Sequence, residues 1–263
     1  MRPILSRRAG IWLFLALAVA VATAALLAPR ADLPPSYHHF ADQRVWLGIP
    51  HFGDVASNVT FLIAGSWGWA FLSRKSSLVQ FVDARERWPY LVVFLGLLLT
   101  AVGSSYYHLA PDNDRLVLDR VPMTIVFMPL VAALIAERVN VKLGLWFLPI
   151  LTAVGIGSVI QWYWTVLHGA GDLRFYLAVQ VYAVLALIAA LLLPPRYTRG
   201  SDLLVVAGLY VLAKICEKAD RQIFSIGHTV SGHTLKHLAA GAAGYWILRM
   251  LQKRQPIQDQ LSL

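Results

Sequence analysis

Two pairs of polar residues at helical spacing interrupt apolar stretches of this chain. His233 and His237 stand four residues apart in SGHTLKHLAAG, at the start of the last apolar stretch. Ser104 stands four residues before His108 in GSSYYHL, at the end of an earlier one. Residues four apart share one face of an α-helix. Each pair can therefore direct both side chains into one site, and Asp119, in LDRVPM, opens the apolar stretch that follows His108.

Three imidazoles with a carboxylate nearby are typical of zinc chemistry. Zinc prefers nitrogen and sulfur ligands in a tetrahedron, and a catalytic site leaves one position for water. Bound water becomes hydroxide near neutral pH and can attack a carbonyl that the metal polarises. A neighbouring carboxylate can take the proton of that water and pass it to a leaving amine. Since histidine and aspartate are costly inside a membrane bundle unless they are paired or metal-bound, this set is a candidate functional site.

Each of these residues also has an ordinary structural interpretation. A single histidine at a helix end is commonly interfacial, and two histidines four apart recur by chance. Ser104 can serve close helix packing, as small residues do in membranes. Asp119 can pair with Arg115 or Arg120. The combination of all five residues at one depth favours the zinc interpretation.

The elements that must position these residues are membrane helices. Hydrophobic residues make up 58% of the 263 residues and charged residues only 14%, which is typical of an integral membrane protein and not of a soluble domain. A membrane-spanning helix needs about 20 apolar residues. The sequence predicts one all-α polytopic membrane helical bundle, with apolar stretches at about 11–28, 54–72, 89–109, 118–137, 143–163, 174–193, 202–217 and 232–250.

The two ends of the chain differ from the bundle. The first apolar stretch follows MRPILSRR and is either a signal anchor or a cleavable signal peptide, with Ala22, Thr23 and Ala24 as the cleavage pattern. This apolar run is longer than the hydrophobic core of a usual signal peptide, which favours retention of the segment in the mature protein. Residues 253–263 form a polar tail that is expected to be disordered.

The basic residues indicate an orientation. If the N-terminus is cytoplasmic, fourteen of the 23 Lys and Arg residues and five of the 14 acidic residues fall on the inner side, leaving nine of each sign outside. This split follows the positive-inside rule and argues against nucleic-acid binding, which needs one dense basic patch. The C-terminus is then also cytoplasmic. All eight histidines face outward, which is the periplasmic side in a bacterium.

The spaced pattern resembles that of a known group of membrane enzymes. Ser-x-x-x-His, an aspartate eleven residues after that histidine, and a late His-x-x-x-His resemble the signature of the CREST superfamily of seven-helix membrane hydrolases. This superfamily includes alkaline ceramidases, the adiponectin and progestin receptors, and factors that remodel the lipids of GPI-anchored proteins. The stretch FGDVASNVTFLIAG, with Ser57 and Asn58, is similar to the first core helix of alkaline ceramidases. GSSYYHLAPDNDRLVLDRVPM and VSGHTLKHLAAG are similar to bacterial ceramidase-like members.

The resemblance implies a fold, a site and a reaction. It implies a seven-helix ceramidase-like domain over residues 31–252, with residues 1–30 as an extra N-terminal hydrophobic segment. It makes His108, His233 and His237 the zinc ligands. Asp119 would hold and deprotonate the zinc-bound water, and Ser104 would orient that water or steady the oxyanion. The implied reaction is hydrolysis of a lipid amide such as ceramide to a sphingoid base and a fatty acid, with the acyl chains inside the bundle.

The sequence departs from the family at the N-terminal side of the core. Alkaline ceramidases of eukaryotes carry an acidic cluster linked to calcium just before the first core helix. Here that region reads YHHFADQRVWLGIPHFGD, in which Asp42 and Asp54 are the acidic residues and His51 stands where a glutamate is expected. The resemblance therefore does not carry a calcium requirement over to this chain.

The interpretation of two further features of the sequence remains open. The charged stretch KICEKADRQ is interpreted as a solvated loop, with recognition of a lipid headgroup as the alternative; its charged residues are Lys214, Glu217, Lys218, Asp220 and Arg221. Lys236 lies between the two late histidines and projects elsewhere on the helix, so it receives no role.

Three rivals to a ceramide amidase remain. The same zinc site could cleave lipid esters in an esterase or phospholipase-type reaction. A receptor-like bundle could hold a structural zinc, and it needs the same ligands as the enzyme. A proton-coupled transporter could use the His and Asp residues, but it should have polar or broken positions at mid-membrane in several helices. Here the polar set gathers near one face, and Gln180 is alone in its stretch, which disfavours transport.

Overall fold

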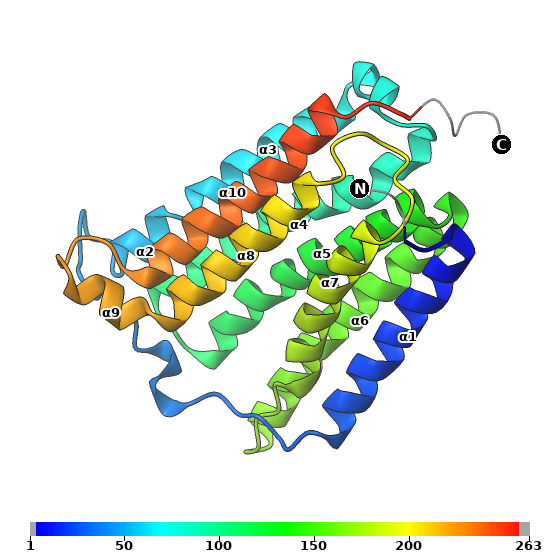
Figure 1. Cartoon of the computed structure of the whole chain (residues 1–263). Helices are drawn as coiled ribbons and strands as arrows, with labels where there is room; N and C mark the ends of the chain where they lie inside the picture. The colour runs from blue at the N-terminus through cyan, green and yellow to red at the C-terminus, as the bar shows by residue number, and fades with distance from the viewer. Residues whose placement is uncertain (1–3, 258–263) are drawn as a thin grey trace.

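The computed structural model describes residues 4–257, and within them the chain is helical with no extended β-strand. The helices run side by side along one common direction, with their ends gathered at two opposite faces (Figure 1). They are α1 (Arg7–Leu27), α2 (Phe52–Ala56), α3 (Val59–Ser73), α4 (Arg87–Leu109), α5 (Asn113–Arg138), α6 (Val141–Leu167), α7 (Arg174–Leu191), α8 (Asp202–Lys218), α9 (Asp220–Ser225) and α10 (Gly232–Lys253). Short 3₁₀ helices cover Pro35–His38, Lys75–Gln80 and Ala84–Glu86.

Each predicted apolar stretch forms a helix, and six helical spans are long and apolar enough to cross a membrane. These spans are Arg7–Leu27, Phe52–Ser73, Ala84–Leu109, Asn113–Arg138, Val141–Leu167 and Arg174–Leu191. The predicted class of an all-α membrane bundle is therefore confirmed, and the chain is a multi-pass membrane protein. The shorter α8 and the more polar α10 pack against each other, and α10 also packs against α3 (Figure 1).

A close crossing of α4 and α5 brings two of the predicted site residues to one place. At Gly103 of α4, an added Cβ atom would overlap the carbonyl group of Leu118 in α5. Glycine is therefore required for the two backbones to approach so closely. Because Ser104 and Asp119 follow these two residues, the crossing places both at one level of the bundle.

Side-chain caps hold the helix ends that carry the site. Ser231 precedes α10, and its Oγ accepts a hydrogen bond from the backbone N–H of Thr234 at 2.9 Å. Asp112 caps α5 in the same way, accepting from the N–H of Arg115 at 2.7 Å. Such caps satisfy backbone donors that the helix itself leaves free. They therefore define where α5 and α10 begin, close to Asp119 and His233.

The first helix lies against the outside of the bundle. α1 packs on α7 (Figure 1), and the hydroxyl of Tyr182 donates to the carbonyl oxygen of Phe14 at 3.4 Å. The segment after α1 is also attached, since the N–H of Leu173 donates to the carbonyl of Ala31 at 2.7 Å. α1 is thus an addition at the edge and contributes nothing to the candidate site.

The prediction that residues 253–263 are disordered is partly wrong. Lys253 still belongs to α10, and Arg254 is 1% exposed. Arg254 pairs with the buried carboxylate of Glu137 and donates to the carbonyl of Gln80 at 3.2 Å. A buried arginine with such partners keeps residues 253–257 attached to the bundle. The rest of the predicted tail, residues 258–263, lies outside the described residues.

Candidate metal centre

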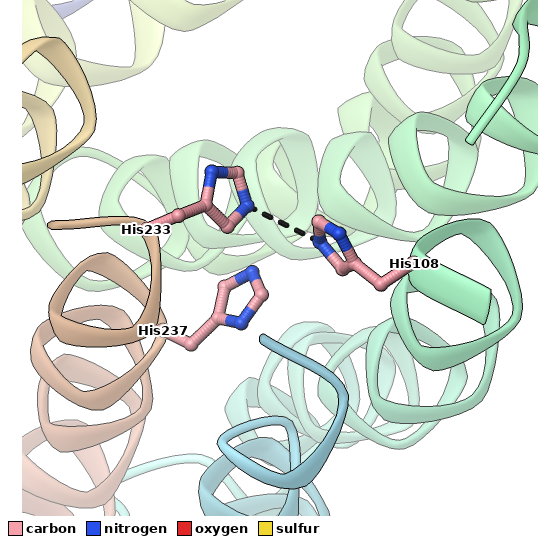
Figure 2. Close-up of side chains that lie close together, drawn as sticks. All are labelled: His108, His233 and His237. Carbon is pink, nitrogen blue, oxygen red and sulfur yellow. Dashed lines mark hydrogen bonds between the residues drawn. The ribbon is translucent and has the colours of Figure 1, made fainter. Parts of the chain in front are cut away.

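The three predicted histidines meet between two helix ends. His108 comes from the last turn of α4, and His233 and His237 come from the first turns of α10 (Figure 2). One nitrogen of each ring lies within 4.8 Å of the others, and Nε2 of His108 is 3.2 Å from Nε2 of His233. All three rings are buried, with 6% exposure or less. The structure therefore brings together three nitrogen donors from distant parts of the chain, with His108 standing 125 residues before His233.

Hydrogen bonds determine which nitrogen of His237 is available. Its Nδ1 lies 3.1 Å from the carbonyl oxygen of Asp54 and 2.9 Å from Oγ of Ser57. The Ser57 hydroxyl in turn donates to the same Asp54 carbonyl at 3.1 Å. Because a carbonyl only accepts, the proton belongs on Nδ1 of His237. Its Nε2 keeps the lone pair, as in metal sites where the second ring nitrogen is held by an outer partner.

An apolar wall shields the other two rings. The ring of Phe40 meets those of His108 and His233 edge-on, with 4.6 Å between centroids in each case. Nδ1 of His108 is buried and has no hydrogen-bond partner among residues 4–257. The α4 end itself is held by His51, whose Nδ1 lies 2.9 Å from the carbonyl oxygen of His108. The histidines are thus oriented by residues from three separate parts of the chain.

The donor set fits a metal ion. Nitrogen lone pairs that face one another in a dry site repel unless a proton or a cation lies between them. Three imidazoles without a carboxylate among them suit a divalent ion that accepts nitrogen ligands. The group formed by His108, His233 and His237 is therefore a possible metal site. The predicted role of these residues as nitrogen ligands is compatible with their geometry.

Ser104 and Asp119 lie beside the histidines in the wall of one large cavity. Both are buried, and they line this cavity together with His237. The cavity has a volume of about 260 Å³ and extends between the helices along mainly apolar side chains of α4, α5, α7, α8 and α10. The carboxylate of Asp119 is not one of the three clustered donors. It thus faces the same space as the histidines without being a member of their group.

The alternative ion pairs for Asp119 are not formed. The guanidinium of Arg120 lies over the rings of Trp162 at 4.3 Å and Tyr176 at 4.8 Å, and Arg115 pairs with its helix-capping neighbour Asp112. Neither arginine makes an ion pair with Asp119 within the described chain. The aromatic contacts supply Arg120 with an electrostatic partner that a linear sequence does not reveal.

A polar layer that sequence analysis missed supports the start of α10. Oδ1 of Asp54 accepts hydrogen bonds from Oγ of Ser231 at 2.9 Å and from Oγ1 of Thr234 at 2.8 Å. Asp220 accepts from the N–H of His233 at 2.8 Å and from that of Ala41 at 2.9 Å. The interpretation of Asp220 as part of a solvated loop is therefore wrong. Its bond to a backbone donor thirteen positions away depends on the turn between α9 and α10.

The interpretation of Lys236 as pointing elsewhere is also wrong. Its Nζ lies 3.4 Å from Nε2 of His233 and 2.7 Å from Oε1 of Glu217. Glu217 is paired with Lys214 as well, so it is also not part of a merely solvated loop. All three side chains line the cavity. The only sequence signal for this arrangement is that Lys236 stands three residues after His233, a spacing that places the two side chains on neighbouring positions of a helix.

Asp42, an acidic residue before α3, is already engaged by a protein group. Asp42 is buried and forms an ion pair with Arg44 at 2.7 Å. Burial by itself raises the pKa of the Asp42 carboxyl, but hydrogen bonds from the side chain and backbone of Arg44 outweigh it and hold this pKa below its usual value. A carboxylate engaged in this way is a poor ligand for a second cation.

Comparison with models of known protein families finds no match for this chain, and comparison with curated proteins finds no similar sequence.

Proposed function

We propose that this protein is a zinc-dependent intramembrane hydrolase that cleaves the amide bond of ceramide-like lipids and releases a sphingoid base and a fatty acid. In this proposal the seven segments α2–α3, α4, α5, α6, α7, α8 and α10 form a seven-helix ceramidase-like core of the CREST type, with α1 as an addition. The observation that carries the proposal is a group of three buried histidines inside a membrane bundle, one of which, His237, lines a mainly apolar cavity. Apolar cavities of this kind accept acyl chains.

Each residue of the site would have a separate role in this reaction. His108, His233 and His237 would hold the zinc ion through three ring nitrogens. When bound, zinc would polarise the scissile carbonyl and acidify a water molecule. The carboxylate of Asp119 would take the proton of the attacking water and deliver it to the nitrogen of the leaving amine. The hydroxyl of Ser104 would orient that water or donate to the oxygen that becomes negative.

The environment of the histidines supports this division. His237 presents one defined nitrogen because Ser57 and the carbonyl of Asp54 hold the other. Asp119 shares the cavity with His237 but has no ion pair among residues 4–257. A carboxylate without a cationic partner is free to accept a proton. The surrounding apolar side chains would keep other water molecules from the reacting carbon.

The test is a lipid panel. Purified protein in detergent is loaded with zinc and incubated with ceramides, acyl-homoserine lactones and phospholipids, and the released fatty acid is measured by mass spectrometry. We expect release from ceramides, and a stronger release from phospholipids would replace the amidase by an esterase or phospholipase-type activity. If no lipid releases more fatty acid with this protein than with the His233→Ala, His237→Ala double variant, the proposed function is wrong.

Asp119→Asn tests the role of the carboxylate. The amide keeps the size of the side chain but cannot accept the proton, so hydrolysis should fall by about 10²–10⁴-fold while zinc is retained. Asp114→Asn is the matched control, since Asp114 lies on the same helix and its side chain accepts from the hydroxyl of Tyr163 at 2.9 Å at an exposed position. Wild-type turnover by Asp119→Asn would assign proton transfer to another group.

A further inference from the structure

A lysine ammonium group lies against one of the nitrogens of the candidate metal centre. Nζ of Lys236 is 3.4 Å from Nε2 of His233, and this same Nε2 is 3.2 Å from Nε2 of His108. The other partner of the ammonium is Oε1 of Glu217 at 2.7 Å. The side chain of Lys236 is only 13% exposed and lines the cavity next to His237. A cation thus stands at the point where the apolar cavity meets the histidines.

The lone pair of His233 cannot serve both the lysine and a metal ion. An imidazole nitrogen has one lone pair, whereas an ammonium group has three N–H donors and no lone pair. Once Nε2 of His233 binds a metal, Lys236 loses this acceptor and keeps Glu217. Since His233 and Glu217 engage two of its three donors in the metal-free site, one donor is free there and a second becomes free once the metal is bound, to bond an oxygen atom of whatever occupies the cavity beside the histidines.

The charges around Lys236 favour an oxygen that is negative or becomes negative. Glu217 lies between Lys214 and Lys236 and pairs with both, so these three side chains together carry one positive charge. Asp119 belongs to a different helix, α5, and lines the same cavity. The cavity therefore contains a carboxylate from α5 and an ammonium group from α10, and its other lining side chains are mainly apolar.

We propose that Lys236 binds the acyl oxygen of the lipid: the carbonyl oxygen of the substrate and a carboxylate oxygen of the released fatty acid. Glu217 is the positioning residue, since its carboxylate holds the ammonium at the cavity. This inference rests on the proposed function, because it names the group that binds the carbonyl oxygen of the amide that is cleaved. A fixed donor aimed at an oxygen that gains charge stabilises the transition state more than the ground state.

The test compares two ligands with the same chain, oleate and oleyl alcohol, on zinc-free protein. Wild-type protein should bind oleate more tightly than oleyl alcohol in a competition assay with a fluorescent fatty acid. Lys236→Met keeps the length and apolar stem of the side chain but removes the charge. It should weaken oleate binding by about tenfold or more and leave oleyl alcohol unchanged, because a hydrogen bond to a charged group is lost.

Two variants serve as controls for folding and for charge in general. Lys218→Met removes an exposed positive charge from the same helix as Glu217, and it should change oleate binding by less than about twofold because exposed charges are screened. Lys236→Arg keeps a cation and should keep most of the preference for oleate. Zinc-loaded Lys236→Met should contain as much zinc as the wild type and hydrolyse ceramide about 100-fold more slowly.

The outcomes separate this inference from the proposed function. If Lys236→Met binds oleate as tightly as the wild type, or if it loses its zinc, Lys236 does not bind the acyl oxygen, whatever the activity of the protein. If the wild type hydrolyses none of the lipids but prefers oleate through Lys236, the assignment of Lys236 stands and the proposed reaction fails.

Discussion

Two clusters of buried polar residues lie at opposite ends of α4, and they are built in opposite ways. The histidine cluster (His108, His233 and His237) lies at its C-terminal end. The ionic cluster lies at its N-terminal end and consists of Glu86, Glu137, Arg196, Tyr197 and Arg254. About 33 Å of helix separates Glu86 from His108, at 1.5 Å per residue.

The ionic cluster satisfies its own charges. Glu137 pairs with Arg254, and Glu86 pairs with Arg196 at 2.7 Å and accepts a hydrogen bond from Tyr197. The guanidinium of Arg254 also lies over the ring of Tyr197 at 4.0 Å. Each carboxylate has an arginine of opposite sign, which is what a buried charge requires. We therefore interpret this cluster as a structural lock between α5, the α7–α8 connection and the end of α10.

In the histidine cluster, the nitrogen acceptors are not fully paired with donor groups of the described chain. Its members are imidazoles that could donate nitrogen lone pairs to a metal rather than charges of opposite sign, and two of their nitrogens face each other at 3.2 Å. The nearest cation, Lys236, is shared with Glu217. The comparison teaches that burial of polar groups alone does not indicate function. Nitrogen acceptors held close to one another in a well-ordered shell are a stronger indication, because the bundle bears the cost of holding them together.

The largest effect should come from removing two donors of the histidine cluster. Wild-type protein should contain about one zinc per chain by metal analysis, and the double variant His233→Ala, His237→Ala should contain none above background. One remaining imidazole cannot hold the ion against chelating buffer. His168→Ala is the control, because His168 is exposed at the end of α6 and bonds the carbonyl of Trp164. Undiminished zinc in the double variant would remove the basis for the site.

A smaller effect, on stability alone, should follow from Glu137→Gln in the ionic cluster. Loss of the carboxylate leaves the buried charge of Arg254 uncompensated, which should cost about 3–5 kcal/mol of unfolding free energy. The measurement is denaturant-induced unfolding in one detergent, with zinc content followed in parallel.

The matched control for the ionic cluster removes both charges. Glu137→Met with Arg254→Met should restore much of the lost stability, since two apolar side chains need no partner. Zinc content should be unchanged in both variants. A loss of zinc from Glu137→Gln would show that the two ends of the bundle are coupled. The ionic cluster and the histidine cluster would then not be independent.

The smallest effect should come from the outer support of the histidine cluster. Ser57→Ala removes one of the two oxygens that hold Nδ1 of His237 and leaves the carbonyl of Asp54 in place. Zinc affinity should fall by about tenfold in competition with a chelator, at the low end of effects seen for such supporting residues. Ser158→Ala is the control, because Ser158 is equally buried but bonds only the carbonyl of Gly155 in α6. Equal affinities in the two variants would mean that Ser57 does not support His237.

The sequence by itself determined the helices and the residues with metal chemistry. Apolar stretches long enough to span a membrane have few alternatives to helix, since every backbone polar group must be satisfied within the segment. The spacing of Ser104 with His108 and of His233 with His237 then determined which side chains share a face. These features depend on local periodicity, which a linear pattern records directly.

Only the tertiary structure decided how these faces meet and what surrounds them. The approach of α4 to α5 depends on Gly103, and the bond from His233 to Asp220 depends on the turn before α10. The place of Lys236 depends on a carboxylate from α8. A lysine holds a defined position only where a partner fixes its long flexible side chain. Partners of this kind come from distant parts of the chain, and only packing brings them together.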